Sequence, residues 1–182
     1  MQALTATPGH VFDRLDSLGI DTVTHTHPPL FTVEQSKALR GDMPGGHCKN
    51  LFLRDRRKRM WLVVCREDLR LDLGWLRQPL GADRLSFGSP DRLMQVLGVV
   101  PGAVSPFALI NDAEGRVQVI LDRHMLALSP LNYHPLSNDM TTAIEPDDLI
   151  TYIRSCGHEP RILDLEPCAT PRRRPASDAR KG

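Results

Sequence analysis

Two apolar segments joined by a charged turn constrain the fold of this chain more than any other feature. Residues 51–54 and 60–65 are rich in apolar side chains, whereas residues 55–59 between them are all charged. Apolar runs on both sides of a short polar turn are typical of an antiparallel hairpin. We therefore expect a β-hairpin with two apolar strands and a basic turn, and we place Cys65 in the core as a small apolar residue.

The rest of the chain moves irregularly between helical and extended patterns. Capping residues and prolines mark helix starts, and glycines mark helix ends. These signals predict helices over residues 8–18, 33–39, 69–80, 90–97 and 146–156. Extended patterns predict further strands over residues 21–27, 84–87, 107–111, 117–121, 133–136, 141–144 and 161–165. Because strands and helices are interleaved without strict alternation, we expect an α/β (α+β) fold in which helices flank a mixed β-sheet.

Length and composition favour one globular domain. The 182 residues are 41% hydrophobic and 25% charged, which is ordinary for such a domain. We expect the domain to span residues 1–166, followed by a basic, disordered tail over residues 167–182 that lacks apolar periodicity. No apolar run approaches the length of a membrane span. Residues 1–10 lack the features of a signal peptide, so we expect a cytoplasmic protein with no membrane partner.

The cysteines and histidines form no recognisable metal or nucleophile motif. No two cysteines make a CxxC pair, so we expect neither a zinc site nor a disulfide, and no metal or other cofactor. His25 and His27 share one face of an expected strand and lack a third ligand, so we interpret them as polar surface residues. His47 and Cys48 are neighbours on an extended segment and point to opposite sides, which disfavours a Cys–His nucleophile.

Lys49-Asn50 is the first of three segments with features that a simple core would not require. The pair follows a loop with two adjacent glycines and begins an apolar strand. A lysine in such a place needs a carboxylate or a bound anion as its partner. An internal salt bridge with Asp55 or Asp122 is the structural alternative to a bound anion.

The other two segments lie far along the chain. Gly102 and Pro106 bracket small residues in a stiff turn, whose backbone N–H groups can face a ligand oxygen. His134 precedes Pro135 and is therefore held in an extended conformation rather than absorbed into a helix. Each of these features also occurs for purely structural reasons, so their combination matters more than any one of them.

Together the three segments resemble one family, the YbaK-like aminoacyl-tRNA deacylases. Residues 46–55, GHCKNLFLRD, are similar to the signature of that family. Residues 102–109, GAVSPFAL, resemble the GxxxP loop of the branch that contains the free-standing alanyl-tRNA(Pro) editing proteins, also called prolyl-tRNA deacylases. His134-Pro135-Leu136, with Asn138 and Thr141, matches the downstream motif of this branch. The resemblance covers about residues 8–166 and leaves out the tail.

The resemblance implies a compact fold like the editing insertion of bacterial prolyl-tRNA synthetases, and hydrolysis of alanine wrongly attached to the proline tRNA. A proline pocket discriminates weakly against a smaller amino acid, because missing methylenes are worth only about 1–3 kcal/mol. The family is thought to act without a metal or an enzymatic nucleophile and to use the ribose hydroxyl of the tRNA itself.

The resemblance also implies roles for individual residues. Lys49 would hold a phosphate or the 3′ end of the tRNA, and Asn50 would hydrogen-bond the ribose or the aminoacyl group. Backbone N–H groups of the Gly102 loop would face the ester carbonyl, and His134 would orient the substrate or a water. The residues expected to line the substrate pocket are Ala103, Ser105, Pro106 and Pro135.

The expected partner is a mischarged tRNA, most simply the proline tRNA, with prolyl-tRNA synthetase as a second candidate. Cations near the hairpin turn can attract acceptor-stem phosphates although the net charge is only +1. The expected tRNA contacts are Arg54, Arg56, Arg57, Lys58, Arg59 and Arg84. Two alternatives stay open: the same fold acting on cysteinyl-, seryl- or threonyl-tRNA, and a tRNA-binding or regulatory module without catalysis.

Overall fold

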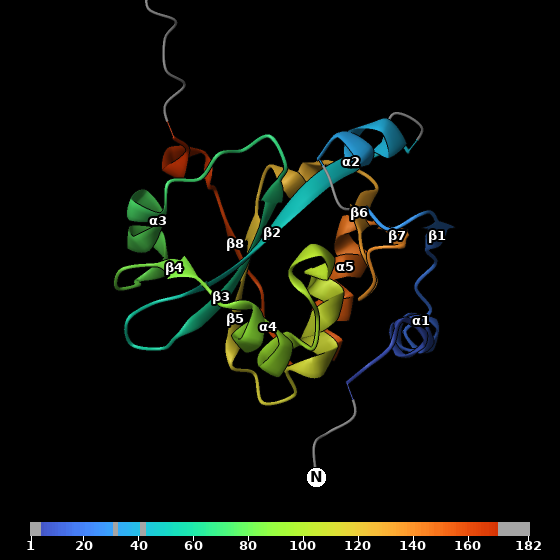
Figure 1. Ribbon diagram of the computed structural model, residues 1–182, viewed down its shortest axis with the longest axis horizontal. Coiled ribbons are helices and arrows are strands. Elements are labelled where there is room, and N and C mark those ends of the chain that lie inside the picture. The colour runs from blue at the N-terminus through green and yellow to red at the C-terminus, as the bar shows by residue number, and fades with distance from the viewer. Residues whose placement is uncertain (1–4, 31–32, 41–42, 171–182) are drawn as a thin grey trace, which may run out of the picture.

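The computed structural model describes residues 5–30, 33–40 and 43–170 (Figure 1). Its α-helices are α1 (Pro8–Ser17), α2 (Val33–Arg40), α3 (Leu73–Leu80), α4 (Pro90–Leu97) and α5 (Pro146–Ser155). Its strands are β1 (Val23–Thr26), β2 (Gly46–Arg54), β3 (Met60–Arg66), β4 (Ser86–Phe87), β5 (Val117–Asp122), β6 (Leu131–Tyr133), β7 (Met140–Ile144) and β8 (Arg161–Leu163). Short 3-10 helices are η1 (Pro101–Ala103), η2 (Pro106–Asn111), η3 (Met125–Ala127) and η4 (Glu166–Cys168).

The strands form one mixed sheet in the order β1-β7-β6-β2-β3-β5-β8, with β4 paired to β2 off this path. The hairpin β2–β3 is antiparallel, as the sequence predicts, and places Arg54 opposite Met60. Parallel pairings join β2 to β6, β3 to β5 and β5 to β8. The expected α+β class with a mixed sheet flanked by helices is therefore confirmed.

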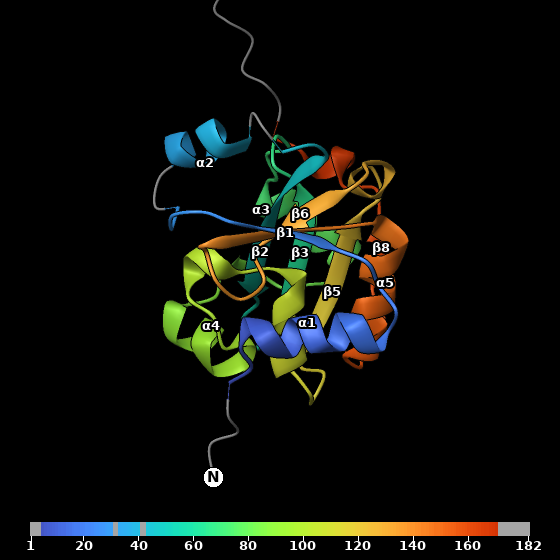
Figure 2. The same ribbon diagram turned by 90° about the vertical axis from the view of Figure 1, so that its right-hand side faces the viewer.

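Helices cover both faces of the sheet because alternate strand residues belong to two different apolar clusters. On one face, Leu62 and Val64 of β3 pack with buried residues of α1, α4 and α5. On the other face, Trp61, Val63 and Cys65 pack with buried residues of α3. Figure 1 shows α3 on one side of β2 and β3, and α4 and α5 on the other. In the turned view of Figure 2, α1 and β1 lie nearest the viewer and α2 lies at the end of the molecule away from α1.

Most expected elements exist, but one has the wrong type. The sequence predicts a strand over residues 107–111, whereas the structure forms the 3-10 helix η2 over Pro106–Asn111. The Ser105 hydroxyl accepts a hydrogen bond from the Phe107 backbone N–H at 3.2 Å, and Pro106 occupies the first helical position. A short apolar run does not by itself distinguish a buried strand from a buried turn of helix, so the cap decides the conformation here.

Caps also move the start of α3. The expected helix over residues 69–80 begins only at Leu73, because the Asp72 carboxylate accepts the backbone N–H groups of Gly74 and Trp75. The predicted strand over residues 84–87 is likewise shorter and covers only Ser86–Phe87.

The ordered chain continues past residue 166. Residues 167–170, which the sequence assigns to the tail, pack against the domain: Cys168 is buried and accepts a hydrogen bond from the Asp72 N–H, and Ala169 bridges to Leu71. Residues 167–170 are therefore packed on the domain, and the rest of the expected tail, residues 171–182, lies outside the described residues. Among the described residues, no helix has both the length and the apolar character needed to cross a membrane.

Candidate functional site

The start of β2 is fixed by close packing that only glycine permits. Gly45 has a φ of 104°, and a Cβ atom there would lie 2.2 Å from the carbonyl oxygen of Pro130. The Gly46 N–H donates to the same oxygen at 2.8 Å. The buried Asn132 amide donates to the Pro44 carbonyl at 3.1 Å and to the Gly46 carbonyl at 3.2 Å. These contacts hold the segment before Lys49 against β6.

Beyond this start, one edge of β2 is left without a strand partner. β3 pairs with the other edge along its length, but β6 pairs only with residues 46–47 and β4 only with residues 53–54. Among the described strands, none pairs with this edge over residues 48–51. Backbone polar groups along an unpaired edge are available to a ligand. Lys49 and Asn50 therefore lie where the sheet opens.

Lys49 has no protein partner for its charge among the described residues. It is half-buried and lies opposite Cys65 in the register of the hairpin. Asp55 instead binds Arg59 at 2.6 Å, and Asp122 accepts the backbone N–H groups of Met125 and Leu165. The alternative of an internal salt bridge is therefore wrong, and the charge stays available for an anion.

Asn50 faces the opposite side of the sheet from Lys49. Its register partner Val64 belongs to the apolar cluster that also contains Ala103. The Oδ1 atom of Asn50 is buried and accepts no hydrogen bond from the described residues. A buried acceptor without a donor costs about 1–3 kcal/mol. Such a group at an open strand edge is consistent with a donor that arrives with a ligand.

The Gly102–Pro106 segment contacts His134 directly. The Ser105 hydroxyl donates to the His134 carbonyl at 2.6 Å, which fixes the loop to the end of β6. Gly102 is exposed and borders the next loop, since a Cβ there would lie 3.9 Å from the Asn138 amide nitrogen. Ala103, Ser105 and Pro106 are buried, and so is Pro135. Their packing shapes the backbone, while Gly102 is the position in this loop where the backbone is most open.

His134 has a defined tautomer. Its Nδ1 atom lies 2.6 Å from the carbonyl oxygen of Met140, which can only accept, so Nδ1 carries the proton and Nε2 the lone pair in the neutral ring. In the parallel pairing His47 lies opposite Asn132, so Lys49 and His134 each follow the last paired residue of their strand by two positions. Two of the three expected segments are thus in contact through Ser105 and His134, and β6, which ends just before His134, pairs with the start of β2 just before Lys49.

Two other expectations concern this region, and the structure contradicts the first and supports the second. His27, expected on the surface, is buried, and it lies beside His134 with 6.0 Å between ring centroids. The shared strand face of His25 and His27 gave no warning, because β1 ends at Thr26 and His27 lies just beyond it. Burial raises the pKa of Cys48 to about 11, and that thiol is therefore protonated at neutral pH and a poor nucleophile.

The basic turn lies at the far end of β2. Arg56, Arg57 and Lys58 are exposed there, and Arg84 is exposed nearby in the loop before β4. Arg59 differs from them, since its guanidinium binds Asp55 and the Gly81 carbonyl and lies 5.4 Å from the Trp61 ring centre. Arg59 therefore shapes the turn, whereas the other cations face solvent.

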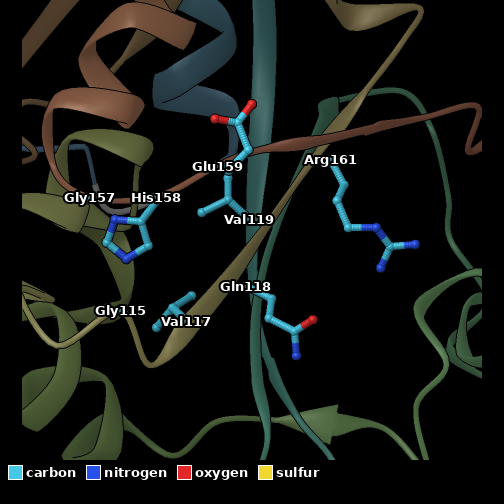
Figure 3. Close-up of a pocket in the computed structure, with 8 residues that line it drawn as sticks. All are labelled: Gly115, Val117, Gln118, Val119, Gly157, His158, Glu159 and Arg161. Atoms are coloured by element: carbon cyan, nitrogen blue, oxygen red, sulfur yellow. The ribbon is translucent and has the colours of Figure 1, made fainter.

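Among the residues that the structure describes, one surface hollow lies away from the expected site residues. This hollow of about 200 Å3 lies beside the start of β5, where His158 and Val117 face it from one side and Arg161 from the other (Figure 3). His158 there bonds the buried Asp112 carboxylate at 2.9 Å. Among the described residues, no three His, Cys, Asp or Glu side chains are grouped to hold a metal ion.

Comparisons with known proteins agree with this geometry. Residues 27–152 match the family described as the aminoacyl-tRNA editing domain. The prolyl-tRNA editing protein ProX of Acetoanaerobium sticklandii is 34% identical over 156 residues, which cover 85% of this chain and 95% of that protein. The prolyl-tRNA synthetase associated domain-containing protein 1 of Danio rerio is 36% identical over 154 residues, which cover 84% of each.

The fold is shared with solved structures as well. The crystal structure of hypothetical protein APE2540 superposes with a TM-score of 0.68 at 19% identity, covering 85% of this chain and 97% of that one. The region that matches the family model includes Lys49, Asn50, the Gly102 loop and His134. The chain therefore belongs to the family of aminoacyl-tRNA editing domains.

Proposed function

We propose that this protein hydrolyses the ester bond of alanine mischarged onto the proline tRNA. Editing of an aminoacyl-tRNA is the hydrolysis of that ester, so membership of the family makes the chain an aminoacyl-tRNA hydrolase. The relatives named for prolyl-tRNA editing and for prolyl-tRNA synthetase support the proline tRNA as the carrier and the synthetase as a partner. The proposed setting is the cytoplasm, where charged tRNA is used.

The observation that carries this proposal is the pair of unsatisfied groups at the open edge of β2. Lys49 offers a cation with no described partner, and Asn50 offers a buried amide oxygen with no described donor. The 3′ end of an aminoacyl-tRNA supplies both complements, namely phosphate anions for the cation and hydroxyl or ammonium donors for the amide oxygen.

The chemistry requires positioning more than a protein nucleophile. A water attacks the ester carbonyl, the bond to the ribose oxygen breaks, and the products are alanine and a tRNA with a free terminal hydroxyl. Lys49 binds the phosphate of the terminal nucleotide, and the neighbouring ribose hydroxyl assists the attack. Backbone N–H groups of the Gly102 loop stabilise the negative charge on the carbonyl oxygen, and the Nε2 atom of His134 orients the water.

The Gly102–Pro106 loop supports a small substrate. Ala103 and Ser105 leave no exposed side chain there, and the Ser105 hydroxyl is already engaged with His134 and Phe107. A loop that is fixed in this way by core packing supports a small aminoacyl group as the proposed substrate. Hydrolysis limited to small aminoacyl groups would be a second selection step after a synthetase that discriminates weakly against amino acids with fewer methylenes.

The basic turn fits the rest of the tRNA. Arg54 lies five positions after Lys49 along the strand, a distance of about 16 Å at roughly 3.3 Å per residue. The single-stranded 3′ end of a tRNA spans a gap of that order. Arg56, Arg57, Lys58 and Arg84 can then meet phosphates of the acceptor stem while the terminal nucleotide lies at Lys49.

Deacylation by a Lys49→Ala variant tests the site. We expect kcat/KM for Ala-tRNA(Pro) to fall by about 100-fold or more, the order seen when one charge-stabilising donor is removed. The melting temperature is expected to stay within a few degrees, because Lys49 has no described ion pair to lose. Arg123→Ala removes an exposed cation after β5 and serves as the matched control. Unchanged hydrolysis in Lys49→Ala would overturn the proposed site.

A panel of charged tRNAs separates the alternatives. Purified protein is incubated with alanyl-, cysteinyl-, seryl- and threonyl-tRNA, and loss of label from each is followed over time. Preferential clearance of alanine supports the proposal, whereas clearance of another amino acid with alanine left intact replaces the substrate. Binding of tRNA without hydrolysis of any of them would show a non-catalytic module instead.

A further inference from the structure

His27 is a buried polar ring with both nitrogens engaged. All residues of β1 before it are exposed, whereas His27 is only 8% exposed. Its Nδ1 atom lies 2.9 Å from the Pro28 carbonyl oxygen, and its Nε2 atom lies 2.8 Å from the Thr141 hydroxyl. Because a carbonyl can only accept, Nδ1 carries the proton and Nε2 accepts from Thr141. The ring is therefore held in one orientation by two defined partners.

These bonds bracket a single residue of β7. The His27 backbone N–H donates to the Asp139 carbonyl at 2.9 Å, and the His27 ring bonds Thr141. Met140 lies between these two anchors. Its carbonyl is the acceptor for the Nδ1–H of His134, at 2.6 Å. The position of that carbonyl therefore depends on both contacts made by His27.

The two rings also lie close together. Their centroids are 6.0 Å apart with an angle of 60° between the planes. His27 thus limits the rotation of His134 from one side, while the Ser105 hydroxyl fixes the His134 carbonyl from the other. A ring nitrogen is set by the hydrogen bond that the other nitrogen makes, so the contacts around Met140 decide which atom of His134 faces the substrate.

We propose that His27 is a positioning residue that keeps His134 in its Nδ1–H tautomer through Thr141 and the Met140 carbonyl. The inference rests on the proposed function only in assigning a catalytic use to the Nε2 atom of His134. His27 acts through its neighbours and does not touch the reacting atoms. Loss of this support leaves His134 in place but lets its two tautomers interchange.

The tautomer of His134 can be read without any activity. Long-range proton–nitrogen spectra of 15N-histidine-labelled protein distinguish Nδ1–H from Nε2–H rings at a pH where histidines are neutral. We expect His134 to be the Nδ1–H form in the native protein. In His27→Phe, which keeps a ring but no nitrogens, we expect a mixture of both forms. His25→Ala, an exposed histidine two residues earlier, is expected to leave the spectrum of His134 unchanged.

A second pair of variants keeps the test decisive if His27→Phe does not fold. Thr141→Val removes the hydroxyl that His27 accepts from, and Thr141→Ser retains it. We expect Thr141→Val to reproduce the mixture and Thr141→Ser to restore the single tautomer. An unchanged Nδ1–H signal in both His27→Phe and Thr141→Val would overturn the inference.

Kinetics then connect the tautomer to the reaction. We expect His27→Phe and Thr141→Val to lower kcat by about 10- to 100-fold while KM changes less than about twofold, as for residues that orient a functional histidine. If the native protein deacylates no tRNA, the proposed function fails, while the spectra still decide the role of His27. A shift of tautomer with unchanged kcat would show that His134 is not used in the reaction and would overturn the positioning role.

Discussion

The two ends of β2 differ in whether their charged and polar side chains have hydrogen-bond partners. At the start, Lys49 has no described ion pair and the Asn50 amide oxygen has no described donor. At the turn, the buried Asp55 carboxylate accepts hydrogen bonds from the backbone and guanidinium of Arg59 and from the Asp83 N–H. One end leaves polar groups unsatisfied, and the other satisfies a buried charge completely.

The difference shows where stability and function lie along one strand. A buried carboxylate with several hydrogen-bond donors holds a turn in one conformation, because loss of these donors would leave a buried charge without partners. An unpaired lysine beside an unbonded amide oxygen contributes little to stability and is ready to bind a ligand. Substitutions at the two ends should therefore change different measurements.

The largest effect is expected at the turn, on stability. Asp55→Ala should lower the free energy of unfolding by about 3 kcal/mol, since Arg59 and two backbone N–H groups lose their acceptor. Urea denaturation measures this change. Asp68→Ala, an exposed acid, is the control and should cost less than about 0.5 kcal/mol. Equal stability of the two variants would contradict a structural role for Asp55.

The same carboxylate predicts how stability depends on pH. Burial alone would raise the pKa of Asp55, but hydrogen bonds from Arg59 and the Asp83 backbone outweigh it and hold the pKa below its ordinary value. Its stabilisation is therefore complete above the ordinary aspartate pKa of about 3.9 and is lost as the pH falls through the lowered value. In Asp55→Asn, the loss of stability between pH ~5 and pH ~2 should be shallower than in the native protein.

The next largest effect is expected at the start of β2, on activity. Gly45→Ala places a Cβ atom 2.2 Å from the Pro130 carbonyl oxygen, so this segment must shift and carry Lys49 with it. A misplacement of about 1 Å can cost about 100-fold in rate. Deacylation kinetics measure this effect. Gly115 also has a positive φ but open space around the Cβ position, so Gly115→Ala should lose some stability and keep its activity.

Asn50→Leu should separate activity from stability. The change removes a buried acceptor that has no described donor, so the free energy of unfolding should stay the same or rise by up to about 1 kcal/mol. Deacylation should fall about tenfold, the effect of losing one hydrogen bond of about 1.4 kcal/mol to the substrate. Asn111→Leu is the contrast, because that amide binds the Leu97 carbonyl and the Ala6 N–H and its loss should be destabilising. A strongly destabilised Asn50→Leu would mean that the amide is structural.

The smallest effect is expected for single cations of the turn. Arg57→Ala should weaken tRNA binding a few-fold and lower the slope of log affinity against log salt by about one for each lost phosphate contact. Titrations at several salt concentrations measure the slope. Stability should change by less than about 0.5 kcal/mol, since Arg57 is exposed. An unchanged slope would show that the tRNA phosphates do not contact Arg57.

Local patterns in the sequence were sufficient for much of the fold. The hairpin β2–β3 follows from apolar runs around a charged turn, and α4 and α5 follow from their prolines, caps and apolar spacing. The segment over residues 107–111 was read as a strand because a short apolar run has no period that distinguishes strand from helix. The Ser105 cap that decides the matter also bonds His134, which lies 29 positions further along the chain.

The site residues also fall into those expected from the sequence and those whose roles only the structure shows. The residue type at Lys49 indicated a carboxylate or a bound anion as its partner, whereas the substrate contacts expected of Asn50 and His134 came from the resemblance to the deacylase family. Arg59 looked like its basic neighbours in sequence, yet its guanidinium is bound to Asp55. His27 looked like His25 in the sequence, yet of these two only His27 is buried, and it lies beside His134. Neither distinction can be read from residue spacing, because the first depends on the buried Asp55 carboxylate and the second on the burial of His27.

The sequence by itself determined which chemical groups the protein has and the local elements that carry them. Hydrogen bonding between neighbours and the period of apolar residues act over a few positions, so they can be read along the chain. Only the tertiary structure decided that β6 pairs with β2 for two residues and then leaves the edge beside Lys49 and Asn50 open. That opening depends on strands more than 80 residues apart and on the glycine contact with Pro130, and no local preference specifies such a pairing.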